Sequence, residues 1–390
     1  MKRVRSGLEE LLARPSRLKG AKVGLIANPT AVTPDLVHAA LHLKALKGAK
    51  LVALFGPEHG VFANAQDLEE VGDLKDPETG LPVYSLYGRT RVPTVQMLKG
   101  IDTLIFDIQD VGSRYYTFIY TMLHAMQACA AHGVRLIVLD RPNPIGGAVV
   151  QGNVLDPAFL SFVGMHPLAV RHGMTVGELA VMFAHELGLK LKLDIIAMKG
   201  WRRSMDFEDT GLPWVLPSPN MPTVDTTFLY PGGCLIEGTN LSEGRGTTRP
   251  FHFIGAPWLD PWKLASDLDR AGLAGLAFRP CYFTPTFQKH AAKLCGGVEV
   301  HITDRSQIDA FYAYLVIIEK ARAQNKAKFA WRTPPYEYEF IKPPIDILCG
   351  TSDVRKAIEA GKPVRRFKAS FDAQAKAFEV VRAPHLIYES

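Results

Sequence analysis

The stretch that decides the fold is Leu51–Gly60, LVALFGPEHG. An apolar run rich in β-forming residues stops at Gly56-Pro57, which predicts a buried parallel strand. Glu58 and His59 follow in a loop at the carboxyl end of that strand. Ligands of open α/β sheets bind in the crevice outside the strand carboxyl ends. The pattern therefore favours a functional role for Glu58 and His59 over a surface turn with a solvated glutamate.

Three further apolar segments have the same form and also end in polar residues. They are KVGLIANPT (22–30), TLIFDIQD (103–110) and RLIVLD (135–140). Helical patterns alternate with them: one opens at Thr33 or Pro34, one has an apolar face from Phe118 to Cys129, and one runs from Thr175 to Gly188. Thr175 and Glu178 have the spacing of a capping box. This alternation predicts an α/β fold, a Rossmann-like doubly wound parallel sheet with right-handed crossovers.

The character of the sequence changes after about Trp201. The segment LPWVLPSPNMPT is punctuated by proline, and the chain beyond it mixes β segments, such as GGVEVHIT, with a helical pattern near 306–324. We predict a Rossmann-like catalytic domain over residues 1–230. A smaller α+β auxiliary domain over residues 231–390 is predicted to close the cleft. The long polar loop 61–80 is predicted to be a lid or rim of the site.

Composition excludes several classes of function. The 390 residues are 47% hydrophobic and 22% charged, which is ordinary for a globular protein. The net charge of +6 is spread along the chain, which argues weakly for an anionic ligand and against nucleic acid. No strand is followed by G-x-G-x-x-G, and neither a P-loop nor G-x-S-x-G occurs. We expect no nucleotide or other cofactor and no esterase elbow.

The cysteines and the N-terminus indicate the compartment. The five cysteines form no C-x-x-C pair, so we expect reduced, buried thiols and neither a disulfide framework nor a zinc site. The basic N-terminus lacks the apolar core of a secretory signal, and no segment is apolar enough for a membrane span. The expectation is a cytoplasmic protein, with a removed leader left open.

Four groups of polar residues are candidates for the site. The first three follow strands and comprise Glu58 and His59; Asp107, Gln109, Asp110, Arg114, Tyr115 and Tyr116; and Arg141 and Asn143. The fourth is a ribbon that opens the second domain and carries Glu237, Asn240, Glu243, Arg245, Thr247 and Arg249. Because the ends of parallel strands converge on one rim, the first three groups can share a crevice that the fourth closes.

The residue types in these groups indicate a hydroxyl-rich substrate that carries an anionic group. Arginine binds carboxylate or phosphate bidentately, asparagine and carboxylate side chains fit sugar hydroxyls, and tyrosine offers a ring to a sugar face. Paired carboxylates are what glycoside hydrolysis normally requires. Structural alternatives stay open for Asp107, which lies inside its strand, and for Arg141, which can pair with Asp140.

At these residues the chain resembles the NamZ-type exo-β-N-acetylmuramidases of peptidoglycan turnover. The resemblance lies in FGPEHG, LIFDIQDVGSRYYTFIYTM, LDRPNPIGG, PSPNMPT and EGTNLSEGRGTTRPF, in order from about Gly7 to the C-terminus. It implies a catalytic cleft between two domains and removal of terminal, non-reducing N-acetylmuramic acid from peptidoglycan-derived disaccharides or muropeptides. Glu58 is then the leading catalytic residue, as general acid, and Asn220 of PSPNMPT joins the substrate-binding candidates.

The sequence leaves several points open. The second catalytic group is Asp110, Glu243 or the acetamido group of the substrate. The lactyl carboxylate of muramic acid is bound by Arg114, Arg141, Arg245 or Arg249. Two rival interpretations are a non-catalytic sugar-binding protein and a metal-dependent hydrolase that uses His59, Asp107 and Asp110. The oligomeric state is not indicated.

Overall fold

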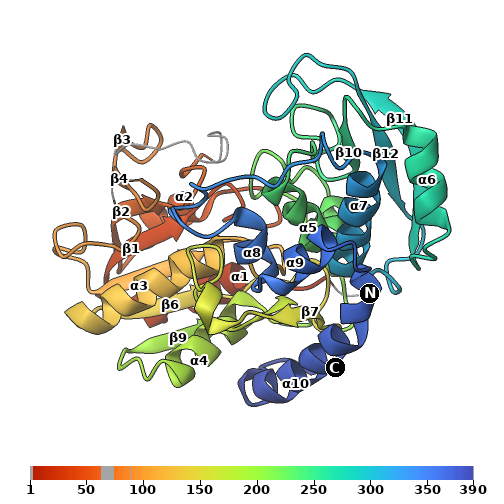
Figure 1. Cartoon of the computed structure of the whole chain (residues 1–390). Helices are drawn as coiled ribbons and strands as arrows, with labels where there is room; N and C mark the ends of the chain where they lie inside the picture. Colours follow the sequence, from red (N-terminus) through yellow and green to blue (C-terminus); the bar gives the residue numbers. More distant parts are fainter. Residues whose placement is uncertain (1–2, 63–73, 89, 390) are drawn as a thin grey trace.

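The computed structural model describes residues 3–62, 74–88 and 90–389, and its first half is built on a twisted sheet (Figure 1). The order of the strands in this sheet is β3-β4-β2-β1-β5-β6-β9. Their bounds are β1 Lys22–Ala27, β2 Lys50–Gly56, β3 Leu74–Lys75, β4 Pro82–Ser85, β5 Thr103–Asp107, β6 Arg135–Leu139 and β9 Leu193–Ile196. Most of the predicted lid, residues 63–73, lies outside the described residues.

Six of these strands are parallel, and they confirm the predicted Rossmann-like topology. Counted along the chain without β3, their spatial order is 3-2-1-4-5-6, the order of the doubly wound dinucleotide-binding fold. The edge strand β3 is antiparallel to β4, which the sequence did not predict. The order reverses between β1 and β5, and this is the topological switch point where Rossmann domains bind their ligand.

Alternating side chains on the central strands create two hydrophobic cores, one on each face of the sheet. On β5, Leu104 and Phe106 point to the face covered by α3 and α4, while Ile105 points to the opposite face, which α1 and α2 cover. The helices are α1 Gly7–Leu12, α2 Ala39–Ala45, α3 Phe118–His132 and α4 Val176–Glu186. Because both faces are covered, β5 is buried along its whole length.

Two of the predicted helix starts can be compared with the structure. The capping box of α4 is confirmed, since Thr175 and Glu178 each accept a hydrogen bond from the other's backbone N–H. The prediction for α2 is wrong by about five residues, because the helix begins at Ala39. Leu36 has a left-handed φ of 64° and interrupts the helical pattern before that point.

The second half of the chain contains a three-stranded antiparallel sheet of order β10-β12-β11. Its elements are α5 Val224–Gly233, β10 Phe253–Ala256, α6 Pro261–Asp269, β11 Leu276–Phe283, β12 Cys295–Ile302, α7 Ala310–Gln324, α8 Pro344–Cys349, α9 Asp353–Glu359 and α10 Lys368–Arg382. Short 3₁₀ helices are Pro15–Leu18, Pro157–Phe159, Glu208–Thr210, Cys234–Gly238 (η4), Val364–Phe367 and Ala383–His385. The final helix α10 packs against a small β-ribbon in the first half, β7 Gln151–Val154 with β8 Ala169–Arg171.

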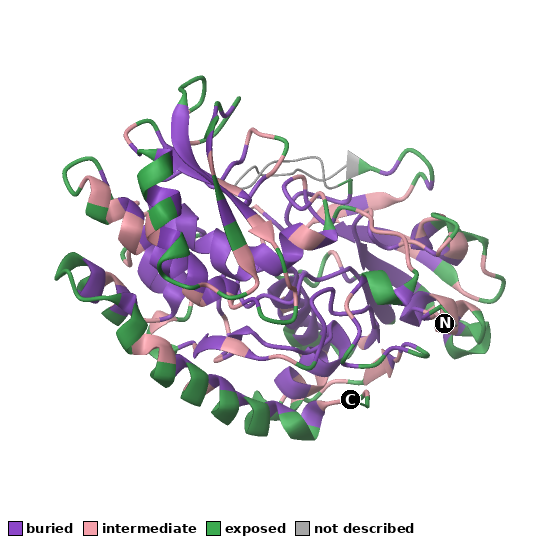
Figure 2. Cartoon of the chain, turned by 90° about the vertical axis from the view of Figure 1, so that its right-hand side faces the viewer, coloured by how far each residue is buried: buried purple, intermediate pink, exposed green. Residues whose placement is uncertain are grey.

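The two halves share one continuous core. Buried residues fill the interior of both and run without a break between them (Figure 2). The predicted boundary at residue 230 falls inside α5 and remains a prediction. All five cysteines are buried and free, as expected. Along the described residues, no helix combines the length and apolar character that crossing a bilayer requires.

The switch point itself is covered by the chain. Asn28, just beyond β1, donates a hydrogen bond of 3.1 Å from Nδ2 to the carbonyl oxygen of Pro217. Leu212 and Pro213 of the same proline-rich segment line a small cavity together with Thr30, which lies just beyond β1. The place where a Rossmann domain holds a nucleotide is therefore lined by this protein's own segment 212–217.

Candidate active site

A tight turn at the end of β2 sets the position of Glu58 and His59. The backbone N–H of Gly60 donates to the carbonyl of Pro57 over 2.9 Å, which closes the turn. His59 lies inside it with a left-handed φ of 67°, unusual for a residue with a Cβ. A Cβ on Gly56 would lie 2.7 Å from the backbone nitrogen of Val61, so the turn needs glycine there.

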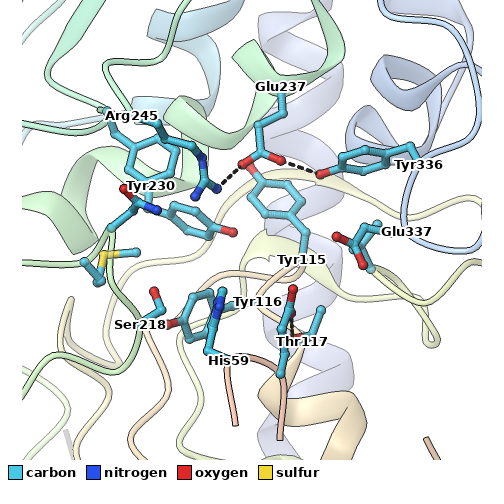
Figure 3. A pocket seen from close by; sticks show the side chains of 15 residues that line it. His59, Tyr115, Tyr116, Thr117, Ser218, Tyr230, Glu237, Arg245, Tyr336 and Glu337 are labelled. Atoms are coloured by element: carbon cyan, nitrogen blue, oxygen red, sulfur yellow. Dashed lines mark hydrogen bonds and ion pairs between the residues drawn. The ribbon is translucent and has the colours of Figure 1, made fainter. Parts of the chain in front are cut away.

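Glu58 and His59 line a buried pocket to which both halves of the chain contribute. Figure 3 shows this pocket from close by. The pocket contains about 460 Å³ of empty volume, including solvent at its mouth. Its lining residues are Glu58, His59, Tyr115, Tyr116, Thr117, Val163, Ser218, Asn220, Met221, Tyr230, Glu237, Arg245, Phe251, Tyr336 and Glu337. The structure thus brings together seven of the residues proposed from the sequence: Glu58, His59, Tyr115, Tyr116, Asn220, Glu237 and Arg245.

Glu58 is held from the side of α3. Thr117, the residue before the first turn of that helix, donates a short hydrogen bond from its hydroxyl to Oε2 of Glu58. The Thr117 side chain makes no capping bond to the helix. A buried carboxyl group with one oxygen fixed in this way has a defined orientation toward the pocket.

A second carboxylate, Glu237 of η4, lies across the pocket in a fixed network (Figure 3). It accepts a hydrogen bond of 2.7 Å from Arg245 at Oε1 and one of 2.8 Å from the Tyr336 hydroxyl at Oε2. Burial alone would raise the pKa of Glu237, but the positive charge of Arg245 and these hydrogen bonds hold it below its ordinary value. Glu237 is therefore an anion that orients Arg245.

Tyrosines supply most of the remaining polar wall. The hydroxyl of Tyr115 donates to the carbonyl of Pro231, and the rings of Tyr116 and Tyr230 meet edge to face with centroids 5.5 Å apart. Burial raises the pKa of all three well above its ordinary value, so they stay protonated and neutral. They present hydroxyl and ring surface suited to a sugar.

Asp107 and Arg141, proposed as substrate-binding residues, lie outside the lining of this pocket. They form a bidentate ion pair, with Nε–Oδ1 2.5 Å and Nη2–Oδ2 3.0 Å, and both are buried. The pair joins the ends of β5 and β6 beside the switch point. The carboxylate that satisfies Arg141 is Asp107 and not Asp140, the partner considered from the sequence.

Three more of the proposed binding residues hold the backbone. Gln109 donates from Nε2 to the carbonyls of Asp110 and Pro142. Asn143 donates to the carbonyl of Met174 over 3.0 Å and accepts from the N–H of Ile145. Arg114 is fully buried and donates to the carbonyls of Asn153, Leu168 and Leu348 over 2.8 to 3.0 Å. These contacts give all three a structural role outside the pocket.

The candidate residues of the ribbon 237–249 also divide into some that line the pocket and others that lie outside it. Arg245 reaches the pocket, whereas Asn240 and Glu243 line a neighbouring cavity that shares Glu237 with it. Glu243 is paired with Lys289 over 2.7 Å and with Arg245 over 3.3 Å. Arg249 is paired with Glu299 over 3.3 Å, with its side chain partly exposed. Thr247 makes a local turn through its hydroxyl, which donates to the Gly244 carbonyl over 2.5 Å.

Asp110, the proposed second catalytic carboxylate, is buried outside the pocket lining. Its Oδ2 accepts from the N–H of Gly112 over 2.7 Å and lies 3.8 Å from Nε2 of His172. Nδ1 of His172 accepts from the N–H of Met174, so the ring proton is on Nε2, facing Asp110. Burial raises the pKa of Asp110 to about 7, which keeps the carboxyl group protonated in mildly acidic solution.

This raised pKa predicts a pH-dependent stability. The folded protein retains the Asp110 proton from about pH 4 to pH 7 while the unfolded chain loses it. The stability that this proton provides is therefore fully present below about pH 4, falls as the pH rises and is lost above about pH 7. We expect Asp110→Asn to remove this loss and to gain up to about 4 kcal/mol relative to wild type between pH 4 and pH 8. Urea unfolding across this range measures it, with exposed Asp372→Asn as control. Parallel stability curves for wild type and Asp110→Asn would contradict the burial argument.

Eight of the lining residues are not among those proposed from the sequence. Thr117, Ser218 and Met221 lie within two residues of proposed residues, in the motifs VGSRYYTF and PSPNMPT. Their closeness in sequence to those residues could have identified them. Phe251 closes the motif EGTNLSEGRGTTRPF, two residues after Arg249, whereas Val163 and Tyr230 lie in none of the motifs. Tyr336 and Glu337 lie in PPYEYEF, whose alternating tyrosines and glutamates after two prolines were visible but follow no strand end.

Within the described parts of the chain, no three His, Cys, Asp or Glu side chains are grouped to hold a metal ion. His59 lines the pocket, while Asp107 is engaged with Arg141 and Asp110 faces His172. The three residues that the metal-dependent interpretation requires therefore have different surroundings and do not form one group of ligands.

Comparison with known proteins identifies the family. Residues 23–225 match the N-terminal and residues 228–388 the C-terminal domain of the family described as exo-beta-N-acetylmuramidase NamZ. The chain is 46% identical over 388 residues to the peptidoglycan beta-N-acetylmuramidase NamZ of Bacillus subtilis strain 168, covering 99% of this chain and 92% of that protein.

Solved structures agree with this assignment. A crystal structure of a DUF1343 family protein from Bacteroides fragilis NCTC 9343 superposes over the full length of both chains, with a TM-score of 0.89 and 34% identity. A second DUF1343 family protein from the same organism gives a TM-score of 0.79 at 32% identity over 99% of both chains. The chain belongs to the exo-β-N-acetylmuramidase NamZ family.

Proposed function

We propose that this protein is an exo-acting glycoside hydrolase that releases terminal, non-reducing N-acetylmuramic acid from peptidoglycan fragments. Membership of the family supports the reaction. The observation that carries it in the structure is that a buried carboxyl group, Glu58, and an arginine, Arg245, line the same pocket. An acid for the leaving oxygen and a cation for an anionic sugar are thereby combined in one site.

In this proposal Glu58, in its protonated form, gives its proton to the glycosidic oxygen as the bond to the anomeric carbon breaks. The Thr117 hydroxyl bonds to Oε2 of Glu58, which leaves Oε1 to carry the proton toward the sugar. Positioned general acids of this kind contribute about 10²- to 10⁴-fold to the rate. The neutral tyrosines around them provide hydrogen bonds and ring faces for the sugar.

Arg245 is proposed to bind the lactyl carboxylate that distinguishes muramic acid from glucosamine. Of the four arginines considered from the sequence, Arg245 lines the pocket. The other three lie outside that lining, where Arg114 donates to three backbone carbonyls, Arg141 pairs with Asp107 and Arg249 pairs with Glu299. The hydrogen bond that Arg245 donates to Glu237 fixes the plane of its guanidinium at the wall of the pocket.

The test is chromophore release from the 4-nitrophenyl β-glycoside of N-acetylmuramic acid beside that of N-acetylglucosamine, with and without a chelator. Turnover of the muramic acid glycoside alone, unaffected by the chelator, is the expected result. Equal turnover of both glycosides would contradict the proposed role of Arg245. Binding of the muramic acid compound by calorimetry without product would favour the sugar-binding alternative, and loss of activity with the chelator would favour metal dependence.

A further inference from the structure

A two-carboxylate hydrolase needs a second group, and neither Asp110 nor Glu243 lines the pocket. Besides Glu58, the carboxylates in the described lining are Glu237 and Glu337. Glu237 has one oxygen bonded to Arg245 and the other to Tyr336. Glu337 comes from the opposite half of the chain to Glu58, and Figure 3 shows its side chain directed toward Thr117, the residue that holds Glu58.

The backbone at Glu337 adopts a conformation that costs energy. Tyr336 and Glu339 exchange two backbone hydrogen bonds of 2.9 Å, which close a four-residue turn. Its two central residues, Glu337 and Tyr338, both have positive φ, 45° and 62°. These are the central positions of a type I′ turn, which are normally filled by Asn or Gly because a Cβ strains the backbone there. Neither Glu nor Tyr is a residue that this turn type favours, so the conformation of the turn does not explain their presence.

Aromatic and cationic contacts hold this turn in place. The guanidinium of Arg91 lies 4.2 Å from the centroid of the Tyr338 ring, which also meets the rings of Tyr87 and Phe162 edge to face, each at 5.7 Å. As Tyr338 packs outward, Glu337 at the preceding position points inward and is buried. The contacts of Tyr338 therefore offset the cost of placing Glu337 in the pocket.

Tyr87 connects Glu337 with Glu58. Its hydroxyl donates to Oε2 of Glu337 over 3.2 Å. Burial, followed by the charges of Glu58 and Glu337, raises the pKa of Tyr87, so both carboxylates lie near this one hydroxyl. Tyr87 therefore stays neutral and donates its hydroxyl proton to the Glu337 carboxyl group.

We propose that Glu337 is the second catalytic carboxylate and acts as the general base. This inference rests on the proposed function of the pocket. Glu337 takes one proton from a water molecule, whose oxygen forms a bond to the anomeric carbon. The glycosidic bond breaks, its electron pair stays on the leaving oxygen, and Glu58 gives that oxygen a proton. The products are the free sugar and the alcohol, with inversion at the anomeric carbon.

The experiment compares Glu337→Gln and Glu337→Ala with a matched control, Glu339→Gln. Glu339 belongs to the same turn, but its carboxylate bonds to the N–H groups of Ile341 and Lys342. We expect kcat to fall at least about 100-fold in both Glu337 variants, on the 4-nitrophenyl glycoside and on a muramic acid–glucosamine disaccharide alike. Glu339→Gln should stay within a few-fold of wild type. Azide, a nucleophile that needs no base, should restore turnover to Glu337→Ala and yield the α-glycosyl azide.

Two readouts decide the proposal. Proton NMR of the wild-type reaction should show the α-anomer of the sugar first, and a β-anomer first would overturn the general-base role. Turnover of folded Glu337→Gln within a few-fold of wild type would also overturn it and would point to the substrate's acetamido group as nucleophile. If wild type cleaves no muramic acid glycoside, the proposed function fails instead, so the two failures are distinguishable.

Discussion

Replacement of Glu58 by Gln should lower kcat on a natural disaccharide by about 10²- to 10⁴-fold, because the amide cannot protonate a sugar leaving oxygen. The effect should be smaller on a 4-nitrophenyl glycoside, whose phenolate leaves with little help. KM should change little, since glutamine has the shape of glutamate and can still accept the hydrogen bond from Thr117. Steady-state kinetics on both substrates measure this difference.

The control for Glu58→Gln is the same exchange at Glu379, an exposed residue of α10. Both variants should unfold at the wild-type temperature. Near-wild-type turnover in folded Glu58→Gln would refute the assignment of Glu58 as the acid. An equal loss on both substrates would show instead that Glu58 acts at a step that does not depend on the leaving group.

Arg141→Met should destabilise the fold by about 3–5 kcal/mol, because removal of one partner leaves the Asp107 carboxylate buried without its counter-charge. The double variant Asp107→Asn/Arg141→Met should regain much of this loss. At a temperature where all variants stay folded, kcat/KM should remain near wild type, since neither residue lines the pocket.

Urea unfolding and kinetics on the same preparations test this prediction for Arg141. Stability near wild type combined with a large rise in KM would contradict it and restore Arg141 as a substrate-binding residue. Arg245→Met provides the comparison, since it should raise KM for muramic acid glycosides if Arg245 binds the lactyl carboxylate.

Periodicity and strand ends predicted the sheet and the location of Glu58 and His59, because both depend on local sequence. They did not predict which strand-end residues face the ligand. Asp107 is the last residue of β5 and Arg141 lies just beyond the adjacent strand β6, and the two form an ion pair. Such pairing depends on the register between strands, which a single sequence does not contain.

The far wall of the pocket was harder still to predict. Glu237 and Glu337 are one hundred positions apart, and Tyr336 is linked to Glu237 by a hydrogen bond of 2.8 Å that only the folded chain creates. Within the ribbon, Arg245 faces the pocket while Arg249 faces Glu299, although both looked equivalent in the sequence. Side-chain direction in an irregular segment follows from tertiary contacts and not from spacing.

The proline-rich segment that covers the switch point has a consequence for how this fold can be recognised. The carbonyl of Pro217 accepts a hydrogen bond from Asn28, just beyond β1. The residues that follow it, Ser218, Asn220 and Met221, line the pocket that contains Glu58. One short piece of chain thus lies where Rossmann domains bind their ligand and also lines the pocket at the end of the neighbouring strand, β2. Strand order alone would predict a nucleotide ligand for this protein, whereas the path of residues 212–221 directs attention to the pocket beside β2.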